Sequence, residues 1–439
     1  MSGDGLSRLA LRAGAVSALH FFLGQTLRVA NHLILARLLF PEAFGLMAIV
    51  DSCMIGLQLF SNLGIQQKII QSPRGTAPSF LNTAWTLQVG RGVLLWLATL
   101  VLAWPLARFY DADALLYLIP VVGLSAVLAG LTSTSQFTLE RQLAPGRVIA
   151  LELVSQLISV AVMIVWAKTT ASVWALVGGA LAYATVMLIG SHIYLPGSRN
   201  RFCWKRDCAR ELIHFGRWML PATMIFFVLV HGNRLIVGKF VTVTELGLFS
   251  VAWFVGTFMV RLMRVLSSRV LLPLFARTSE LGTERLTTRM ARVRGYLLVL
   301  ILPPICAIAV WGNELVSLLY DDRYLEAGWM VQVLALGSVL GAINTSAEPL
   351  ILARGDSRRH FLSLAGSLVL FVVFLLVGTL LWGWHGIVVA VAATSLARYP
   401  FLAWALHRHG AWQPRVDLFA MFGAVALMGL LELGKTGLM

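Results

Sequence analysis

The chain has 439 residues, of which 58% are hydrophobic and 13% are charged. Soluble globular domains contain about 45–50% apolar residues, so the composition excludes a water-soluble globule and indicates a polytopic membrane protein. The net charge of +15 would suggest a nucleic-acid partner in a soluble protein. In a membrane protein it first reflects where the loops carry their cations, and we expect no nucleic acid as a partner.

Apolar windows of about 18 to 25 residues predict about thirteen membrane-spanning helices and no sheet. In chain order they fall near 12–38, 43–63, 82–105, 114–135, 148–167, 172–195, 215–238, 246–268, 295–311, 328–352, 361–382, 385–406 and 418–433. A basic stretch containing Pro and Gly separates the sixth span from the seventh. We therefore expect an N-terminal lobe at 1–195, a basic cytoplasmic linker at 196–214, a C-terminal lobe at 215–406 and an additional helix within 407–439.

One pattern occurs twice, 202 positions apart. The segment from Asn31 to Leu46 contains an Asn, an aliphatic triplet, a small residue, a cation and then a Gly-Leu pair, and the segment from Asn233 to Leu248 repeats this order. An internal repeat at this distance indicates a duplicated half. Because six spans return the chain to its starting side, the two six-helix lobes should be related by an axis along the membrane normal, as in many transporters.

Most of the cations fall on one side of the membrane in this topology. With the N-terminus in the cytoplasm, 23 of the 35 Lys and Arg residues fall in cytoplasmic segments, including six in 269–294, and only six fall on the opposite side. This asymmetry follows the positive-inside rule. It predicts a multi-pass membrane protein with a cytoplasmic N-terminus, and it adds an attraction to anionic membrane lipids.

Motifs for catalysis, nucleotide hydrolysis and metal binding are absent from the sequence. There is no GxxxxGK loop, no HExxH and no paired CxxC, and the connections are too short to house a soluble active site. The spacing of Cys203, Cys208 and His214 is too loose for a zinc site. We expect no metal, no cofactor and no enzymatic activity.

Six arginines remain inside the predicted spans. An Arg at the centre of a bilayer costs about 2.5–3.5 kcal/mol, so it usually faces a water-filled cavity or a partner charge. Snorkelling to a headgroup is equally compatible with Arg234 and Arg398, which lie near span ends. For the deeper cations we favour a cavity that binds an anion, because the planar guanidinium suits phosphate. The candidate residues for binding a phosphate-bearing anion are Arg28, Arg91, Arg234, Arg261 and Arg264.

Uncharged polar residues and acids accompany these arginines. In the first two spans they recur at helical spacing and so share a face, although Asn and Gln also stabilise helix bundles by bonding between helices. The candidate cavity-lining residues are His20, Asn31, His32, Gln58 and Asn62. Three acids in the spans are candidates for ion coupling, or equally for fixed salt bridges with an Arg: Asp51, Glu152 and Glu348.

The stretches ARLLFPEAFGLMAIV at 36–50, LFSNLGIQQKIIQ at 59–71 and FLNTAWTLQVGRG at 80–92 resemble the N-terminal half of Wzx-type polysaccharide exporters. These belong to the multidrug/oligosaccharidyl-lipid/polysaccharide exporter superfamily, and the resemblance is closest to its WzxC-like branch. Many relatives have fourteen spans, whereas this chain has about thirteen.

The resemblance implies two six-helix lobes around a central cationic cavity. It also implies a flippase of the bacterial inner membrane that carries a polyprenyl-diphosphate-linked oligosaccharide outward by alternating access. The carried product would serve exopolysaccharide, capsule or O-antigen synthesis, with a polysaccharide polymerase and export machinery as expected partners. Two alternatives stay open at this point. A drug or small-molecule antiporter of the same superfamily would be expected to have acids in its cavity, and a membrane-embedded polymerase or acyltransferase usually needs a large outer loop.

Overall fold

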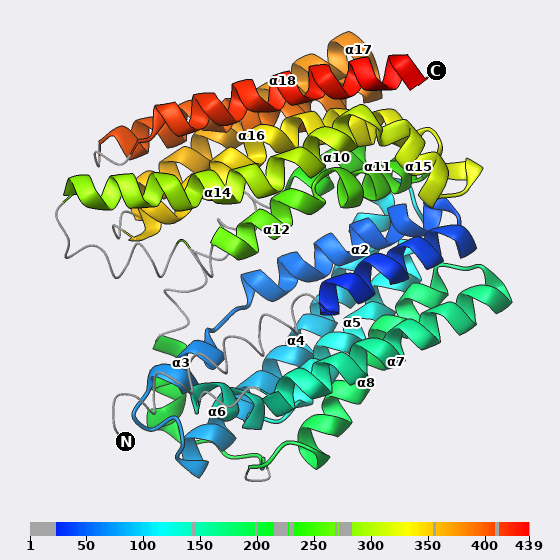
Figure 1. The fold of residues 1–439 in the computed structure, drawn as a ribbon. Coiled ribbons are helices and arrows are strands. Elements are labelled where there is room, and N and C mark those ends of the chain that lie inside the picture. The colour runs from blue at the N-terminus through cyan, green and yellow to red at the C-terminus, as the bar shows by residue number, and fades with distance from the viewer. Residues whose placement is uncertain are drawn as a thin grey trace. The chain divides into compact units, whose positions relative to one another are not determined.

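The computed structural model describes residues 23–142, 146–197, 200–214, 227, 232–267, 271, 283–353, 357–408 and 412–438. All regular structure in these ranges is helical (Figure 1). The chain forms two compact units, Met1–Val243 and Thr244–Met439, which are called unit 1 and unit 2 below. Among the described residues, eight helices are long and apolar enough to span a membrane, or up to ten if each of two bent helix pairs counts as one span.

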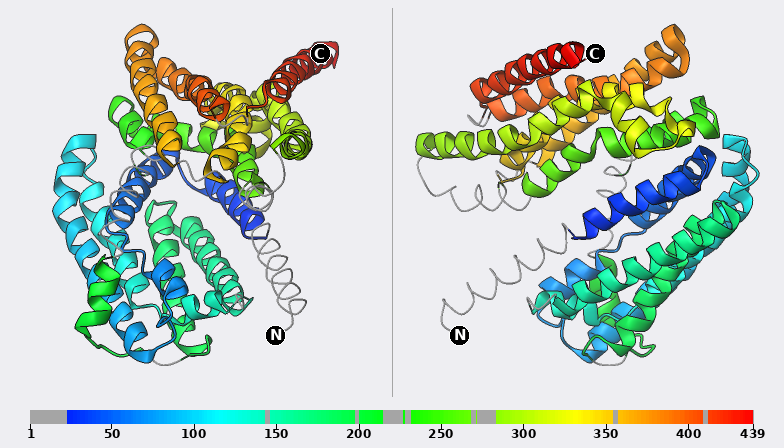
Figure 2. Two further views of the ribbon diagram at one scale, coloured as in Figure 1. Left: turned by 90° about the vertical axis from the view of Figure 1, so that its left-hand side faces the viewer. Right: turned by 45° about the vertical axis from the view of Figure 1, so that its right-hand side comes forward.

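Unit 1 consists mainly of long helices packed side by side (Figure 2). A helix over residues 23–38 precedes α2 (Pro41–Phe60), and α3 (Ile65–Gln71) follows it. The remaining elements are α4 (Pro78–Tyr110), α5 (Leu115–Leu131), α6 (Ser135–Arg141), α7 (Gly146–Thr170), α8 (Trp174–Ile193), a short helix over 206–214, and α10 (Gly232–Phe240). The pairs α4 with α5 and α7 with α8 make the most extensive contacts within this unit.

Unit 2 begins with α11 (Val243–Gly256) and α12 (Phe258–Leu266), which meet at a 45° bend. It continues with α14 (Thr283–Val310), α15 (Gly312–Leu319), the 3-10 turn η2 (Asp322–Tyr324) and α16 (Ala327–Ala353). The last elements are α17 (Ser357–His407) and α18 (Pro414–Leu438). Gly383 interrupts α17 with a φ of 57°, a conformation that favours glycine, so α17 provides the two spans predicted at 361–382 and 385–406.

The duplicated pattern has a counterpart in the helix boundaries. The first described helix ends at residue 38 and α2 begins at Pro41, while α10 ends at Phe240 and α11 begins at Val243. Both boundaries are displaced by the 202 positions found in the sequence. The all-helical membrane fold is therefore confirmed, together with the repeat of this helix–turn–helix at the start of each predicted lobe.

The additional helix α18 packs along α14 and also contacts α16. Ala424 of α18 joins a buried apolar cluster that includes Leu298, Ile301 and Ile305 of α14. The linker segment is held in unit 1, where Cys208 and Leu212 are buried against Ile69 and Phe80. The division into lobes at 196–214 stays a prediction, and along the sequence the boundary between the two compact units falls after Val243.

Candidate functional site

A polar cavity of about 770 Å³ lies within unit 1, among α2 to α8. Eleven of its 23 lining residues have side chains that can form hydrogen bonds, and amides and hydroxyls predominate among these. Lipid cannot satisfy such groups, so the cavity is suited to water or to a polar solute. These lining residues are Gln58, Asn62, Gln66, Gln67, Gln88, Arg91, Ser125, Thr132, Gln136, Ser159 and Tyr183.

The break between α5 and α6 gives the cavity one of its walls. The two helices meet at a bend of 58°, which leaves backbone carbonyls at the end of α5 without helical partners. Gln88 supplies a donor, since its Nε2 lies 3.0 Å from the carbonyl oxygen of Ala129 and 3.2 Å from that of Gly130. Glycines allow α4 and α5 to approach closely here, because a Cβ at Gly92 would lie 2.6 Å from the carbonyl oxygen of Ala126.

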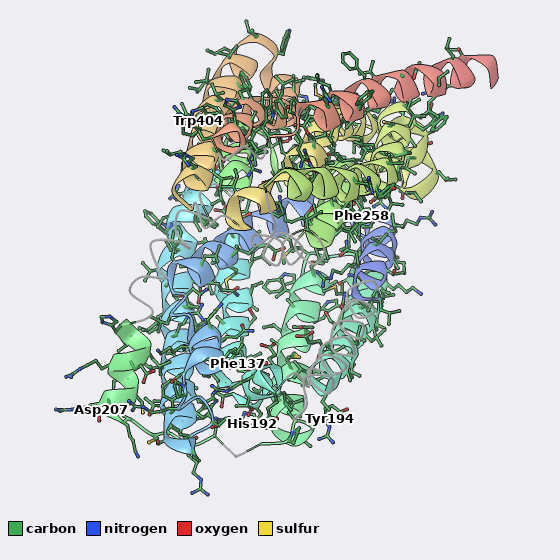
Figure 3. The ribbon with its side chains drawn as sticks, turned by 60° about the vertical axis from the view of Figure 1, so that its left-hand side comes forward. Phe137, His192, Tyr194, Asp207, Phe258 and Trp404 are labelled. Atoms are coloured by element: carbon green, nitrogen blue, oxygen red, sulfur yellow. The ribbon has the colours of Figure 1, made fainter. Side chains whose placement is uncertain are left out.

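Two rings satisfy the last carbonyl of α5. The indole Nε1 of Trp85 donates to the oxygen of Leu131 at 3.2 Å, and Nε2 of His192 lies 2.9 Å from the same oxygen. Figure 3 labels His192 and also Phe137, whose side chain belongs to α6 and lines the cavity. The bend is thus fixed by side chains from α4 and α8, and the cavity wall is a defined part of the fold.

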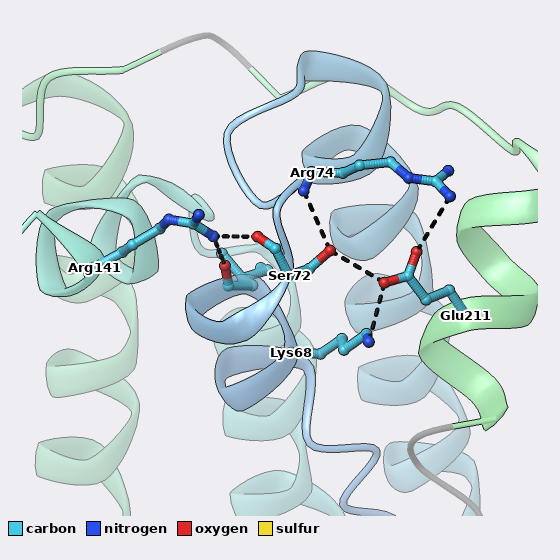
Figure 4. A network of polar contacts seen from close by, with 6 residues as sticks. Lys68, Ser72, Arg74, Arg141 and Glu211 are labelled. Atoms are coloured by element: carbon cyan, nitrogen blue, oxygen red, sulfur yellow. Dashed lines mark hydrogen bonds and ion pairs between the residues drawn. The ribbon is translucent and has the colours of Figure 1, made fainter.

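A network of charged side chains holds the end of unit 1 that carries α3 and α6 (Figure 4). Arg141 Nη1 donates to the carbonyl oxygens of Ile69, at 2.8 Å, and of Ser72. Glu211, from the helix over 206–214, accepts from the Ser72 hydroxyl at 3.1 Å and pairs with Lys68 at 3.0 Å. The α3 and α6 segments beside the cavity are therefore fastened to each other and to the linker.

Partial burial raises the pKa of Glu211, but hydrogen bonds from Lys68 and Ser72 and the charges of Lys68 and Arg74 lower it more. The net result is a pKa below the ordinary value of a glutamate. Glu211 is therefore ionised at neutral pH, and the linker stays attached to α3.

Arg91 is the cation of this cavity. Its Nε donates to the Ser61 hydroxyl at 3.0 Å and its Nη2 donates to the carbonyl oxygen of Gln58 at 2.8 Å, so it caps the C-terminal end of α2. Both acceptors are uncharged, and no Asp or Glu lines the cavity among the described residues. Gln58, Asn62 and Arg91, three of the predicted residues, thus share one site.

Other predicted residues of unit 1 lie on a neighbouring face. The Arg28 side chain is exposed and lies within electrostatic range of Glu152 and of Tyr183, which lines the cavity. Asn31 Nδ2 lies 3.5 Å from Met163 Sδ, and the His32 ring lies 5.3 Å from that of Phe44. This helix face therefore packs against α7 and α2.

Five further predicted residues fall elsewhere or cannot be placed. The Asp51 side chain is exposed on α2. In unit 2, Arg264 is exposed, and Arg261 donates to the carbonyl oxygen of Phe254 at 2.5 Å with its guanidinium 4.6 Å from the Phe254 ring. His20 and the Arg234 side chain lie outside the described part of the chain.

Glu348 is paired rather than free. Its carboxylate forms a salt bridge with Arg398, and both side chains are mostly buried, at 17% and 16% exposed. The sequence is compatible with either a fixed salt bridge or ion coupling for this acid, and the observed geometry is that of the salt bridge.

The sequence prediction for Arg294 was wrong. It was grouped with the cytoplasmic cations of 269–294, yet its side chain is 1% exposed and lies in the candidate span Ala291–Val310. Its Nη2 lies 2.5 Å from Asp417 Oδ1 of α18, and its Nε donates to Ser346 Oγ at 2.7 Å. Tyr399 donates to the other Asp417 oxygen at 3.0 Å. The sequence signal that could have indicated this pair is an arginine near a predicted span end together with an acid in the additional helix.

Comparison with known proteins identifies the family of this chain. Residues 34–329, more than half of the chain, match the model of the family described as polysaccharide biosynthesis protein. The chain belongs to this family. Two similar relatives are the teichuronic acid biosynthesis protein TuaB of Bacillus subtilis, 19% identical over 86% of this chain and 78% of the relative, and the lipopolysaccharide biosynthesis protein WzxC of Escherichia coli, 20% identical over 81% and 72%.

Two solved structures share the fold of this chain. The lipid II flippase MurJ in an inward closed conformation superposes with a TM-score of 0.74 at 12% identity, covering 95% of this chain and 92% of MurJ. An inward-facing multidrug resistance MATE transporter of the MOP superfamily gives a TM-score of 0.68 at 12% identity, covering 89% and 95%. This member of the polysaccharide biosynthesis protein family therefore has the two-lobe transporter fold that its sequence predicted.

Proposed function

We propose that this protein is a flippase that carries a polyprenyl-diphosphate-linked oligosaccharide across the bacterial inner membrane by alternating access, with its N-terminus in the cytoplasm. The observation that carries the proposal is the amide- and hydroxyl-lined cavity of unit 1, whose only fully charged lining residue among those described is Arg91. Membership of the polysaccharide biosynthesis protein family supports the same function.

The chemistry of the cavity fits the polar part of such a substrate. Sugar hydroxyls both donate and accept hydrogen bonds, and Gln and Asn side chains offer both roles. Each unsatisfied polar group in hydrocarbon costs several kcal/mol, whereas a polyprenyl chain is soluble in lipid. The protein therefore has to shield the diphosphate and the sugars, and the chain can remain in the membrane. Translocation of this kind breaks no covalent bond, and the proposal includes no enzymatic step.

The remaining predicted residues have roles in this proposal. Arg28, Arg234, Arg261 and Arg264 are proposed to attract the diphosphate in addition to Arg91, with His20, Asn31 and His32 as polar contacts. Asp51 and Glu152 are the proposed acids for coupling to an ion gradient. Glu348 is a weaker candidate for coupling, because its salt bridge with Arg398 holds its charge in place. A polysaccharide polymerase and export machinery are proposed as partners that use the delivered product.

The fold is shared with MATE transporters, so a drug or small-molecule antiporter is the alternative. Acids in the binding cavity would favour a cationic drug, and the lining of this cavity contains a cation instead. The positive charge of Arg91 supports an anionic substrate.

Depletion of the protein in its own host tests the proposal. Lipid-linked saccharides are extracted and measured by mass spectrometry, and their membrane side is assigned with an impermeant sugar-modifying reagent. We expect one polyprenyl-diphosphate oligosaccharide to accumulate on the inner face. An unchanged lipid pool would contradict the flippase proposal and favour the antiporter.

A further inference from the structure

A second, apolar hollow adjoins the polar cavity of unit 1. It has a volume of about 620 Å³ and lies along α2 and α4, with Leu57, Phe60, Leu87 and Leu94 on its walls and Trp204 of the linker segment beside them. We call it the α2–α4 groove. Apart from Arg91, the described residues that line it carry no charge.

Arg91 belongs to both spaces. Together with Leu95 it lines the polar cavity and the α2–α4 groove, so one guanidinium stands at the boundary between an apolar compartment and a polar one. Its two hydrogen bonds use Nε and Nη2, and Nη1 makes no hydrogen bond to the described residues. The carbonyl end of a helix carries only about half an elementary charge, so most of the positive charge of Arg91 is not balanced by its contacts.

We propose that the α2–α4 groove, Arg91 and the polar cavity form one binding site for an isoprenoid-linked phosphate. The isoprenoid units next to the phosphate lie in the groove, the phosphate binds Arg91, and the saccharide extends into the cavity. This inference rests on the proposed function and adds to it the place in unit 1 where lipid, phosphate and sugar meet.

The order of the three parts matches the order of the chemistry in the ligand. In a lipid-linked saccharide the anionic group lies between an apolar chain and a polar glycan, and here the cation lies between an apolar groove and a polar cavity. Phosphate binding by arginine needs free N–H groups, which Nη1 supplies without disturbing the cap on α2. A solute without the apolar chain would leave the groove empty, and an uncharged lipid would leave Arg91 unbalanced.

Gly90 provides a variant that tests the groove alone. It is exposed, it lines the groove, and a Cβ built on it meets no atom within 4 Å. Gly90→Leu therefore fills the groove while leaving the Arg91 cap intact, and leucine is a better helix former than glycine. Gly429→Leu is the matched control, because Gly429 also has open space, lies in α18 and is not among the residues that line either hollow.

The binding experiment uses the full-length protein in detergent and geranylgeranyl diphosphate as the probe, measured by native mass spectrometry and by quenching of tryptophan fluorescence. We expect Arg91→Gln and Gly90→Leu each to weaken binding by about tenfold or more, as expected for loss of a charge-assisted contact or of buried apolar area. Gly429→Leu should bind as the wild type does. Geranylgeraniol and inorganic diphosphate, which carry one half of the probe each, should bind more weakly than the whole.

Three results would overturn the inference. Unchanged binding by Gly90→Leu would exclude the groove, and unchanged binding by Arg91→Gln would exclude the phosphate contact. Equal competition by phosphatidylglycerol would show a general site for anionic lipids. The sidedness assay separates this inference from the proposed function. If both variants translocate normally while depletion of the protein still causes accumulation on the inner face, the binding site is wrong and the flippase function is kept.

Discussion

The long helix α4 of unit 1 and the long helix α14 of unit 2 each direct one polar side chain at the backbone of the next long helix. Gln88 of α4 donates to carbonyls near the end of α5, and Arg294 of α14 donates to the carbonyl oxygen of Ile343 in α16 at 3.1 Å. The amide is neutral and borders a polar cavity. The guanidinium is charged, and α18 supplies Asp417 to neutralise it.

This difference separates two uses of polar groups in a membrane protein. In unit 2 the buried charge is balanced internally, so it holds helices together. In unit 1 the uncharged amides surround a hollow, and the nearby cation Arg91 is balanced only by neutral acceptors. A buried arginine with an acidic partner is neutralised within the helix bundle, whereas an arginine without one in a membrane protein usually faces a water-filled cavity.

The largest effect is expected from breaking the pair in unit 2. Arg294→Ala leaves Asp417 buried without its counter-charge, and loss of one partner of a buried pair typically costs about 3–5 kcal/mol. We expect a strongly lowered thermal unfolding midpoint in detergent, measured by intrinsic fluorescence. Arg292→Ala, two residues away and exposed, is the control. Equal midpoints for the two variants would contradict an architectural role.

A large loss of transport with little loss of stability is expected for Arg28→Ala. The Arg28 side chain is exposed, so its removal creates no cavity, but it removes a proposed attraction for the diphosphate. We expect at least about tenfold slower translocation, equal to about 1.4 kcal/mol, in the sidedness assay, with an unchanged unfolding midpoint. Arg108→Ala, an exposed arginine at the far end of α4, should transport normally. Wild-type transport by Arg28→Ala would defeat the role.

A moderate effect is expected for Gln88→Leu. The substitution leaves the carbonyls of Ala129 and Gly130 without their donor, which costs about 1–3 kcal/mol for a buried group. We expect a fall in unfolding midpoint smaller than that of Arg294→Ala. Gln67 also lines the cavity and makes no hydrogen bond to the described residues, so Gln67→Leu should leave the midpoint nearly unchanged. If Gln88→Leu lowered the unfolding midpoint as much as Arg294→Ala does, the contrast between the two units would be contradicted.

The smallest effect concerns the network around Glu211. Because the pKa of Glu211 in the folded protein lies below its ordinary value of 4.5, its stabilising contribution is present above that value and is lost as the pH falls through the lowered pKa. Comparison with Glu211→Gln should show a difference of about 0.5–1 kcal/mol at neutral pH. That difference should persist to about pH 5 and vanish in stronger acid. A stability difference between wild type and Glu211→Gln that grows on acidification would contradict the pairing of Glu211 with Lys68.

Much of the fold could be predicted from the sequence, because apolar length and cation placement are direct consequences of the bilayer. The spans predicted at 82–105 and 148–167, for example, lie within α4 and α7. The duplicated Asn31 and Asn233 segments also located equivalent helix boundaries in each predicted lobe.

The site could be predicted only in part. Helical spacing identified Gln58 and Asn62, but it could not show that Gln66, Gln88 and Gln136 converge on the same cavity, because that depends on the bend between α5 and α6. Charge counting likewise treated Arg294 as a loop residue, since its partner Asp417 lies 123 positions away. Tertiary pairing at such distances leaves no local pattern.

The distance between Arg294 and Asp417 also has a consequence for how the protein is made. Helices enter the membrane in the order of their synthesis, so α14 arrives well before α18. During that interval the guanidinium of Arg294 has no carboxylate from α18 to neutralise it, and a charge in that state is costly in lipid. The partly made bundle is therefore less stable than the complete one, and the insertion of α18 with Asp417 removes the cost of the unpaired charge.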